Sequence, residues 1–382
     1  MAGLQVLTNE TAPPIPGERR SSCAGLGISR LQSLDCLRAI ACLAVIYGHC
    51  PGKIGLPGGW ITGEYGVSLF CVLSGFLITS ILLGEEARKR SIDLLGFLQR
   101  RAVRIVPAYM LVLFLTIIFI KSGVLFGHNP SDVHLFFSKL IGLVTFTANE
   151  GGPFPLTHYW SVSIEEQFYC TLPIVLLICR TTKTRVATLA VVCVAIAFVF
   201  KSGELGNVAF FPLSLGTLLA LTNGKISQPN LNPWITLGAA FFAVALVVLT
   251  ATPSLSPYGP IASSAFAFLV WSAARQQIPI VVLKPLAYVG RISYSIYLSH
   301  WTLLIFTDYA LRKIGLGDSS LCQFALASAA SIAFASVSWH YFEEPILRCK
   351  NRLGRRFWGV LVALTSPALL AAGVICHALF HV

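Results

Sequence analysis

The sequence predicts an all-α protein, a polytopic bundle of about 10–11 membrane-spanning helices. The 382-residue chain is 55% hydrophobic and only 12% charged, with a mean hydropathy of +0.74. One water-soluble core cannot bury so much apolar surface, so lipid is the expected solvent. Apolar stretches long enough to cross a bilayer, about 20 residues each, are centred near Ala41, Ser74, Leu113, Leu172, Val194, Ser214, Val244, Phe266, Leu298, Ala330 and Leu369.

The distribution of Lys and Arg along the chain predicts its orientation. Basic short loops stay on the cytoplasmic side of a membrane, and most basic residues fall inside when the N-terminus is cytoplasmic. We therefore expect a cytoplasmic tail at residues 1–30, a membrane domain at 31–350 and an additional C-terminal transmembrane helix at 351–382. The expected location is the cell's inner membrane, crossed many times.

The formal net charge of +12 raises the question of a nucleic-acid partner. The basic residues are dispersed over membrane-adjacent loops instead of clustering on one soluble domain. The positive charge is therefore interpreted as setting the orientation of the chain in the membrane and as attracting it to the lipid bilayer. No nucleic-acid partner is expected.

Two ionisable residues, Arg38 and His49, lie within the first apolar segment. Eleven residues are about three helical turns, so both side chains share one face, about 16 Å apart. The structural alternative is that Arg38 anchors the cytoplasmic helix end by snorkelling and that His49 sits at the far interface. Because imidazole titrates near neutral pH, His49 is the leading candidate for a general base.

A basic cluster, Arg100, Arg101 and Arg104, precedes the third apolar segment. Arg101 and Arg104 are about one helical turn apart, and guanidinium groups suit bidentate binding of phosphate. The positive-inside rule explains the same cluster equally well.

The stretch 159–169 begins the fourth apolar helix and is unusually polar. Ser161, Glu165 and Tyr169 follow one another at helical spacing and predict a polar stripe. Carboxylates that enter a membrane are costly and often functional. The alternative is an interfacial helix start, with acidic residues at its positive end and Trp160 in the aromatic belt.

Two motifs follow in the C-terminal half of the chain. His300 lies inside the stretch 291–301, where a hydrogen-bonded structural histidine and a functional one are equally plausible. Glu343, Glu344 and Pro345 are interpreted as a helix stop.

Taken together, these stretches resemble the acyltransferase-3 family of integral-membrane O-acyltransferases, which includes polysaccharide and lipo-oligosaccharide O-acetyltransferases. The resemblance covers about residues 34–350. Cys36, Cys71 and Glu344 depart from the residues usual in the family, and none touches the proposed chemistry. The motifs that carry the family resemblance lie at 34–40 with His49, and at 66–79, 100–109, 159–169, 292–301 and 342–345.

The resemblance implies a donor such as acetyl-CoA on the cytoplasmic side, a glycan or glycolipid acceptor, and no bound cofactor or metal. His49 is expected to act as base, or as a transient acyl carrier, with Glu165 orienting it. It also implies a stand-alone member, without the fused hydrolase-like domain of many relatives. The expected donor-binding residues are Arg38, Arg100, Arg101 and Arg104, and the expected acceptor or path-lining residues are Trp160, Ser161, Tyr169, His300 and Trp301.

A secondary transporter or lipid-linked sugar carrier is the alternative function, since intramembrane His, Arg and Glu residues also mark ion-coupled transport. Such proteins often contain inverted repeats with broken helices in corresponding positions. The sequence has no evident repeat of this kind.

Overall fold

The structure, a computed structural model, describes residues 28–50, 59–123, 125, 130–149, 152–199, 209–222, 233–249, 256–275, 284–317 and 319–349. All regular elements in these ranges are helices, which confirms the predicted all-α class. The proposed tail lies outside the described residues except for its last three, which begin the first helix. The proposed C-terminal helix at 351–382 also lies outside them.

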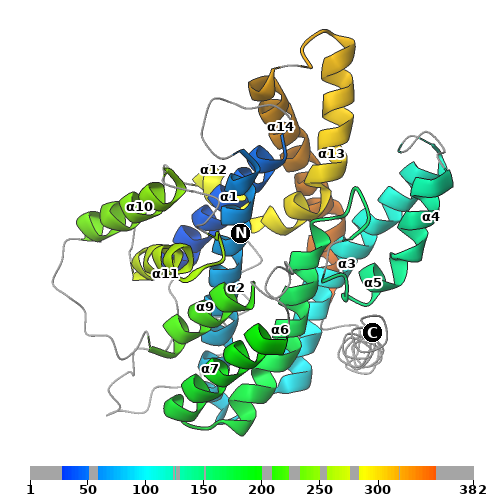
Figure 1. The fold of residues 1–382 in the computed structure, drawn as a ribbon. Coiled ribbons are helices and arrows are strands. Elements are labelled where there is room, and N and C mark those ends of the chain that lie inside the picture. Colours follow the sequence, from blue (N-terminus) through cyan, green and yellow to red (C-terminus); the bar gives the residue numbers. More distant parts are fainter. Residues whose placement is uncertain are drawn as a thin grey trace.

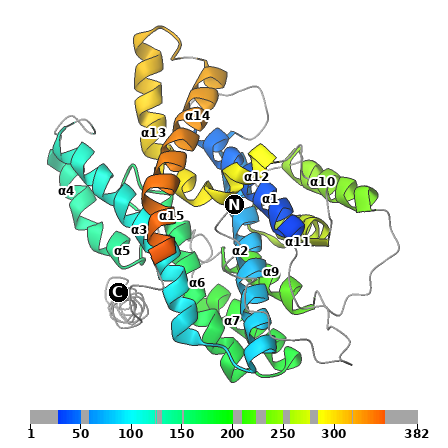
Figure 2. The same cartoon turned by 180° about the vertical axis from the view of Figure 1, so that it is seen from behind.

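The described helices are shown in chain order in Figures 1 and 2. They are α1 (Ile28–His49), α2 (Gly59–Lys89), α3 (Leu94–Lys121), α4 (Pro130–Ser138), α5 (Leu140–Val144), α6 (Tyr159–Ile178), α7 (Thr182–Val199), α9 (Phe210–Thr222), α10 (Pro233–Leu249), α11 (Pro260–Arg275), α12 (Lys284–Arg291), α13 (Ser293–Lys313), α14 (Ser320–Ser338), the π-helix η3 (Trp339–Glu343) and α15 (Glu344–Cys349).

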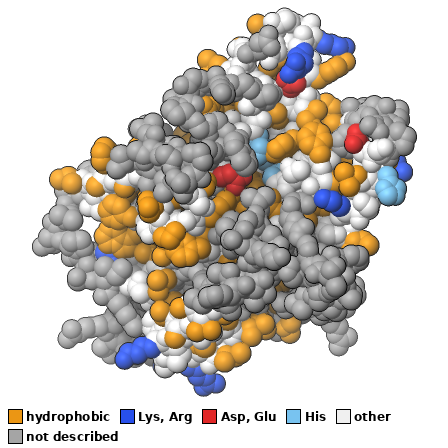
Figure 3. Space-filling model, in the orientation of Figure 1, with side chains coloured by type: hydrophobic (Ala, Val, Ile, Leu, Met, Phe, Trp, Pro, Cys, Tyr) orange, Lys and Arg blue, Asp and Glu red, His pale blue; other side chains and the backbone are white. Residues whose placement is uncertain are grey.

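Four helical stretches of the described chain are long and apolar enough to cross a membrane: Gly63–Lys89, Leu94–Lys121, Tyr159–Ile178 and Ser320–Arg348. The chain is therefore a multi-pass membrane protein, and the total number of crossings stays a prediction. α1 and α13 are not among the four, because ionisable residues lower their mean hydropathy. Figure 3 shows hydrophobic side chains spread over the described part of one face, with Lys and Arg at its edges.

Helices α1 and α2 occupy the centre of the bundle, between α9 to α11 on one side and α3, α6 and α13 on the other (Figure 1). Three apolar clusters meet there. Val45 of α1 belongs to the cluster with α3 and α6, Leu34 to the cluster with α11, and Ile46 to the cluster with α13 and α14. The helix that carries His49 is thus held by neighbours on several sides.

Glycines allow two close helix crossings. A Cβ added to Gly216 of α9 would lie 2.1 Å from the carbonyl oxygen of Val72 in α2. A Cβ added to Gly290 of α12 would lie 1.7 Å from the carbonyl oxygen of Asp35 in α1. Small residues at such contacts let membrane helices approach closely, and both contacts fix the position of the central pair.

The predicted helix stop at Glu343–Pro345 is wrong. The chain continues from α14 through η3 directly into α15. Glu343 is buried and accepts hydrogen bonds from Ser295 and Ser338, so its carboxylate has partners inside the bundle. Pro345 is the second residue of α15 and has no N–H to donate, and the π-helical turn η3 lies directly before it.

Candidate functional site

The site begins at the last residue of α1. His49 Nδ1 lies 2.9 Å from the carbonyl oxygen of Val45 and 3.2 Å from His300 Nε2, which projects from α13. His300 Nδ1 lies 2.6 Å from the carbonyl oxygen of Tyr297. Two residues that are 251 positions apart therefore form one imidazole pair.

The hydrogen bonds of this pair determine where its protons lie. A carbonyl oxygen only accepts, so Nδ1 of His300 carries a proton and, in the neutral ring, its Nε2 is an acceptor. His49 Nδ1–H then donates toward both the Val45 carbonyl and His300 Nε2. The neutral His49 ring is left with an unprotonated Nε2, and a positioned imidazole with a free lone pair can accept a proton.

His158 and Trp301 complete the cluster, and sequence reasoning missed His158. The His158 ring lies 4.6 Å from that of His300 and stacks on Trp301 at 6.0 Å and 4°. Trp301 also lies 4.1 Å from the His49 ring. The only sequence signal was the position of His158 directly before the polar stretch 159–169.

His158 is 4% exposed, and neither of its ring nitrogens has a hydrogen-bond partner in the described chain. Burial, and then the nearby His49, lower its pKa to about 3, against a small opposing effect of the Leu298 and Tyr297 carbonyl groups. His158 is therefore neutral at physiological pH, and its backbone is held in place by the Tyr297 hydroxyl, which donates to its carbonyl oxygen at 3.1 Å.

Glu165 does not contact His49. Its two carboxylate oxygens accept hydrogen bonds from Ser74 at 2.8 Å and from Tyr169 at 3.0 Å. The expected orienting contact is thus not formed, because α6 directs Glu165 toward α2, and His300 takes that position instead. The bond to Tyr169 does confirm the predicted polar stripe on α6, while a catalytic role for Glu165 stays a prediction.

The other residues of the 159–169 motif lie near the histidine cluster. The Ser161 hydroxyl is 2.6 Å from that of Tyr297, and Ser161 also donates to the His158 carbonyl at 3.2 Å. Trp160 is 4% exposed and contacts the Tyr258 ring edge-on at 5.8 Å. Tyr258 in turn donates a hydrogen bond to Glu64. These contacts place the start of α6 beside the cluster.

The arginines separate into two groups. Arg100 pairs with Glu85 at 2.8 Å with its side chain 41% exposed. Arg104 donates to the Arg291 carbonyl at 2.9 Å and lies over the Trp339 ring at 4.6 Å. Both are held by other parts of the protein.

Arg38 and Arg101 form no hydrogen bond or ion pair with the residues that the structure describes. Arg101 lies over the rings of Phe97 and Tyr169, at 5.7 Å and 5.9 Å. Arg38 is close enough to interact electrostatically with Arg101 and with Glu165. Asp35 also interacts electrostatically with Arg38, and Glu166 with Arg101, but neither carboxylate forms an ion pair with them. Guanidinium groups in this state can bind an anion such as a phosphate.

The site thus has arginine side chains near one end of α1 and the histidine pair at the other. Arg38 and His49 lie on α1, about 16 Å apart along its axis, as the sequence predicted. No cluster of three or more His, Cys, Asp or Glu side chains suited to a metal ion occurs in the described ranges. An unprotonated imidazole nitrogen at one end of α1 and arginine side chains at the other are chemically suited to group transfer.

An apolar helical bundle with a histidine pair, and with two arginines that form no ion pair in the described ranges, suits a membrane-bound transferase. Residues 31–340 match the family described as the acyltransferase domain, and the chain belongs to this family. It is similar to the O-acetyltransferase OatA of Staphylococcus aureus, with 28% identity over 352 residues. It is also similar to the peptidoglycan O-acetyltransferase OatA of Listeria monocytogenes, with 28% identity over 375 residues.

Each of these alignments covers 83% of this chain and 57% or 56% of the relative. The chain therefore spans little more than half the length of the curated relatives that it matches. No solved structure matches the chain.

Proposed function

We propose that this chain transfers an acetyl group from acetyl-CoA, or another acyl-CoA, to a hydroxyl group of a glycan or glycolipid in the cell's inner membrane. The observation that carries the proposal is the hydrogen-bonded His49–His300 pair, which leaves Nε2 of His49 unprotonated. Membership of the acyltransferase family supports the reaction class. It also favours acyl transfer over the transporter alternative.

Arg38 and Arg101 bind the phosphates of the donor at the cytoplasmic end of the site. Both lack an ion-pair partner in the described chain, and both belong to helices that the positive-inside rule orients toward the cytoplasm. The thioester then extends along α1 toward His49, about 16 Å away. Tyr169, which lies beneath Arg101 and binds Glu165, lines this path.

In the transfer step, the acceptor hydroxyl donates its proton to His49 Nε2 while its oxygen attacks the thioester carbonyl carbon. The carbon–sulfur bond breaks as the new ester bond forms, and the CoA thiolate leaves. The proton on His49 then passes to that thiolate, which restores the neutral ring. His300 stabilises the intermediate imidazolium because its Nε2 accepts the hydrogen bond from His49 Nδ1–H.

The name of one relative supports the proposed class of acceptor. The Listeria monocytogenes relative is named a peptidoglycan O-acetyltransferase, so a polysaccharide hydroxyl is the proposed acceptor here. Trp301, whose ring lies 4.1 Å from that of His49, offers aromatic surface on which a sugar ring can stack.

The experiment is transfer of radiolabelled acetyl from acetyl-CoA into the glycan fraction of membranes that contain the chain. Label in ester linkage, released by mild base, supports the proposal. Membranes with the chain absent give the background. The transporter alternative is tested with a radiolabelled sugar added separately. Accumulation of that sugar in the vesicles, with the acetyl-CoA left unconsumed, supports the transporter instead.

A further inference from the structure

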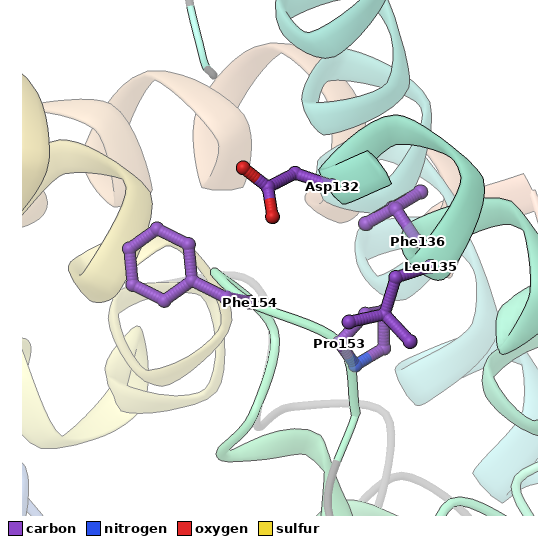
Figure 4. Close-up of a pocket in the computed structure, with 5 residues that line it drawn as sticks. All are labelled: Asp132, Leu135, Phe136, Pro153 and Phe154. Carbon is purple, nitrogen blue, oxygen red and sulfur yellow. The ribbon is translucent and has the colours of Figure 1, made fainter. Parts of the chain in front are cut away.

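A pocket of about 290 Å³ lies between α4 and the loop at residues 152–158. Figure 4 shows the Asp132 carboxylate and the Phe154 ring on opposite sides of one space, with Pro153 below them. Leu135 and Phe136 of α4 complete the lining. None of these residues belongs to the histidine cluster or to the arginine group.

One residue that lines the pocket contacts the proposed catalytic cluster. The Phe154 ring contacts Trp301 edge-on at 6.2 Å, and the Trp301 ring lies 4.1 Å from His49. The loop that presents Phe154 to the pocket ends at His158, inside the cluster. A group bound against Phe154 is therefore separated from His49 by one tryptophan ring.

Close backbone contacts hold the loop at residues 152–158 against the pocket. A Cβ added to Gly152 would lie 2.2 Å from the carbonyl oxygen of Leu156, so the two ends of the loop are in close contact. The Leu156 N–H donates to the Pro153 carbonyl at 2.6 Å. Leu156 itself is fully buried, which anchors the loop while the Phe154 ring remains 46% exposed.

The chemistry of the lining selects a neutral sugar. An exposed aromatic ring offers a flat apolar face for the C–H groups of a pyranose, as in pockets that combine apolar surface with a few polar groups. A carboxylate accepts hydrogen bonds from sugar hydroxyl or amide N–H groups. The negative charge of Asp132 disfavours phosphate, so the donor is not the ligand that fits here.

We propose that this pocket is a subsite for the sugar residue next to the one that is acylated, so that the acceptor is an oligomeric glycan and not a single sugar. The inference rests on the proposed function. It assigns Phe154 as the stacking surface and Asp132 as the hydrogen-bond acceptor for that neighbouring sugar.

The test is calorimetric binding of a β-1,4-linked N-acetylglucosamine tetramer, and of the monosaccharide, to the full chain in detergent. The wild type is expected to bind the tetramer at least about tenfold more tightly than the monosaccharide. Phe154→Ala is expected to weaken tetramer binding about tenfold, and Phe154→Tyr to retain it. Phe114→Ala removes a ring that is 60% exposed on α3 and is expected to leave binding unchanged.

Equal tetramer binding by the wild type and by folded Phe154→Ala would overturn the subsite, as would equal affinity of the wild type for the two sugars. Asp132→Asn provides a second variant and is expected to weaken binding of the tetramer but not of the monosaccharide. Because binding is measured without turnover, the subsite can stand even if acetyl transfer fails. If acetyl transfer occurs but tetramer binding does not depend on Phe154, the subsite is contradicted and the proposed function is not.

Discussion

His300 Nε2 lies 3.2 Å from His49 Nδ1 and joins α13 to the end of α1. The contact gives His49 a fixed tautomer, because the Nδ1–H of His300 is committed to the Tyr297 carbonyl. A second imidazole therefore holds the position that a carboxylate commonly occupies beside a catalytic histidine. In the proposed mechanism His300 is a positioning residue, since it acts through His49.

His300→Ala is expected to lower kcat for acetyl transfer by about 10- to 100-fold, with KM for both substrates nearly unchanged. The loss corresponds to about 1.5–3 kcal/mol for a hydrogen bond to a charged group. Steady-state kinetics with labelled acetyl-CoA measures it. His300→Gln, which retains an acceptor, is expected to recover part of the rate; an unchanged kcat in His300→Ala would contradict the positioning role.

Arg101→Ala is expected to raise KM for acetyl-CoA by about 10- to 100-fold, because one charge-assisted contact with phosphate is lost. Arg100→Ala is the matched control, since Arg100 is exposed and already pairs with Glu85. Donor titrations of the two variants measure the difference. Equal effects of the two substitutions would show that general positive charge, and not the Arg101 position, attracts the donor.

His158 makes stability depend on pH. Its pKa is lowered to about 3 in the folded protein, mainly by burial, whereas an unfolded histidine titrates near 6.5. Below about pH 6.5 the unfolded state therefore binds a proton that the folded state does not bind. The contribution of His158 to the free energy of unfolding is complete above that pH and decreases as the pH falls toward 3. Between pH 7 and 5 the free energy of unfolding should fall by about 2 kcal/mol.

Thermal unfolding in detergent at several pH values, followed by tryptophan fluorescence, checks this expectation. His158→Phe keeps an aromatic ring and removes the titrating group, so its Tm is expected to vary less with pH than that of the wild type. Identical pH profiles would show that His158 is not the group responsible.

Gly290→Ala is expected to destabilise the protein by about 1–3 kcal/mol, because its Cβ would overlap the Asp35 carbonyl oxygen at the crossing of α12 and α1. Gly238→Ala in α10 is the control, since its Cβ would meet no atom within 4 Å. The Tm of the two variants in detergent gives the comparison. A Gly290→Ala protein as stable as Gly238→Ala would mean that the two helices separate without cost.

Residue spacing within single helices was predictable, and contacts between helices were not. Arg38 and His49 lie on one helix, as their spacing predicted, and Glu165 bonds to Tyr169 one turn away. The pairing of His49 with His300 depends on the crossing of α1 and α13, which no local pattern specifies. His158 was missed for the same reason: its neighbours in the cluster come from α1 and α13.

The helical class followed from composition alone, but details of the helices depended on tertiary partners. The sequence around Glu343 and Pro345 has the local features of a helix end. The buried hydrogen bonds of Glu343 to Ser295 and Ser338 favour a π-helical turn that continues the helix. Likewise, the short helices α4 and α5 between α3 and α6 are held by buried side chains, Phe136 of α4 and Leu143 of α5.

The most direct measurement of the central claim is the single-turnover rate of acetyl transfer from acetyl-CoA to glycan by purified wild type, His49→Ala and His340→Ala. His340 is a 54% exposed histidine outside the cluster and serves as the control. If His49 is the base, His49→Ala is expected to lose about 10²- to 10⁴-fold in rate, and His340→Ala to keep the wild-type rate. A wild-type rate in folded His49→Ala would contradict His49 as the base.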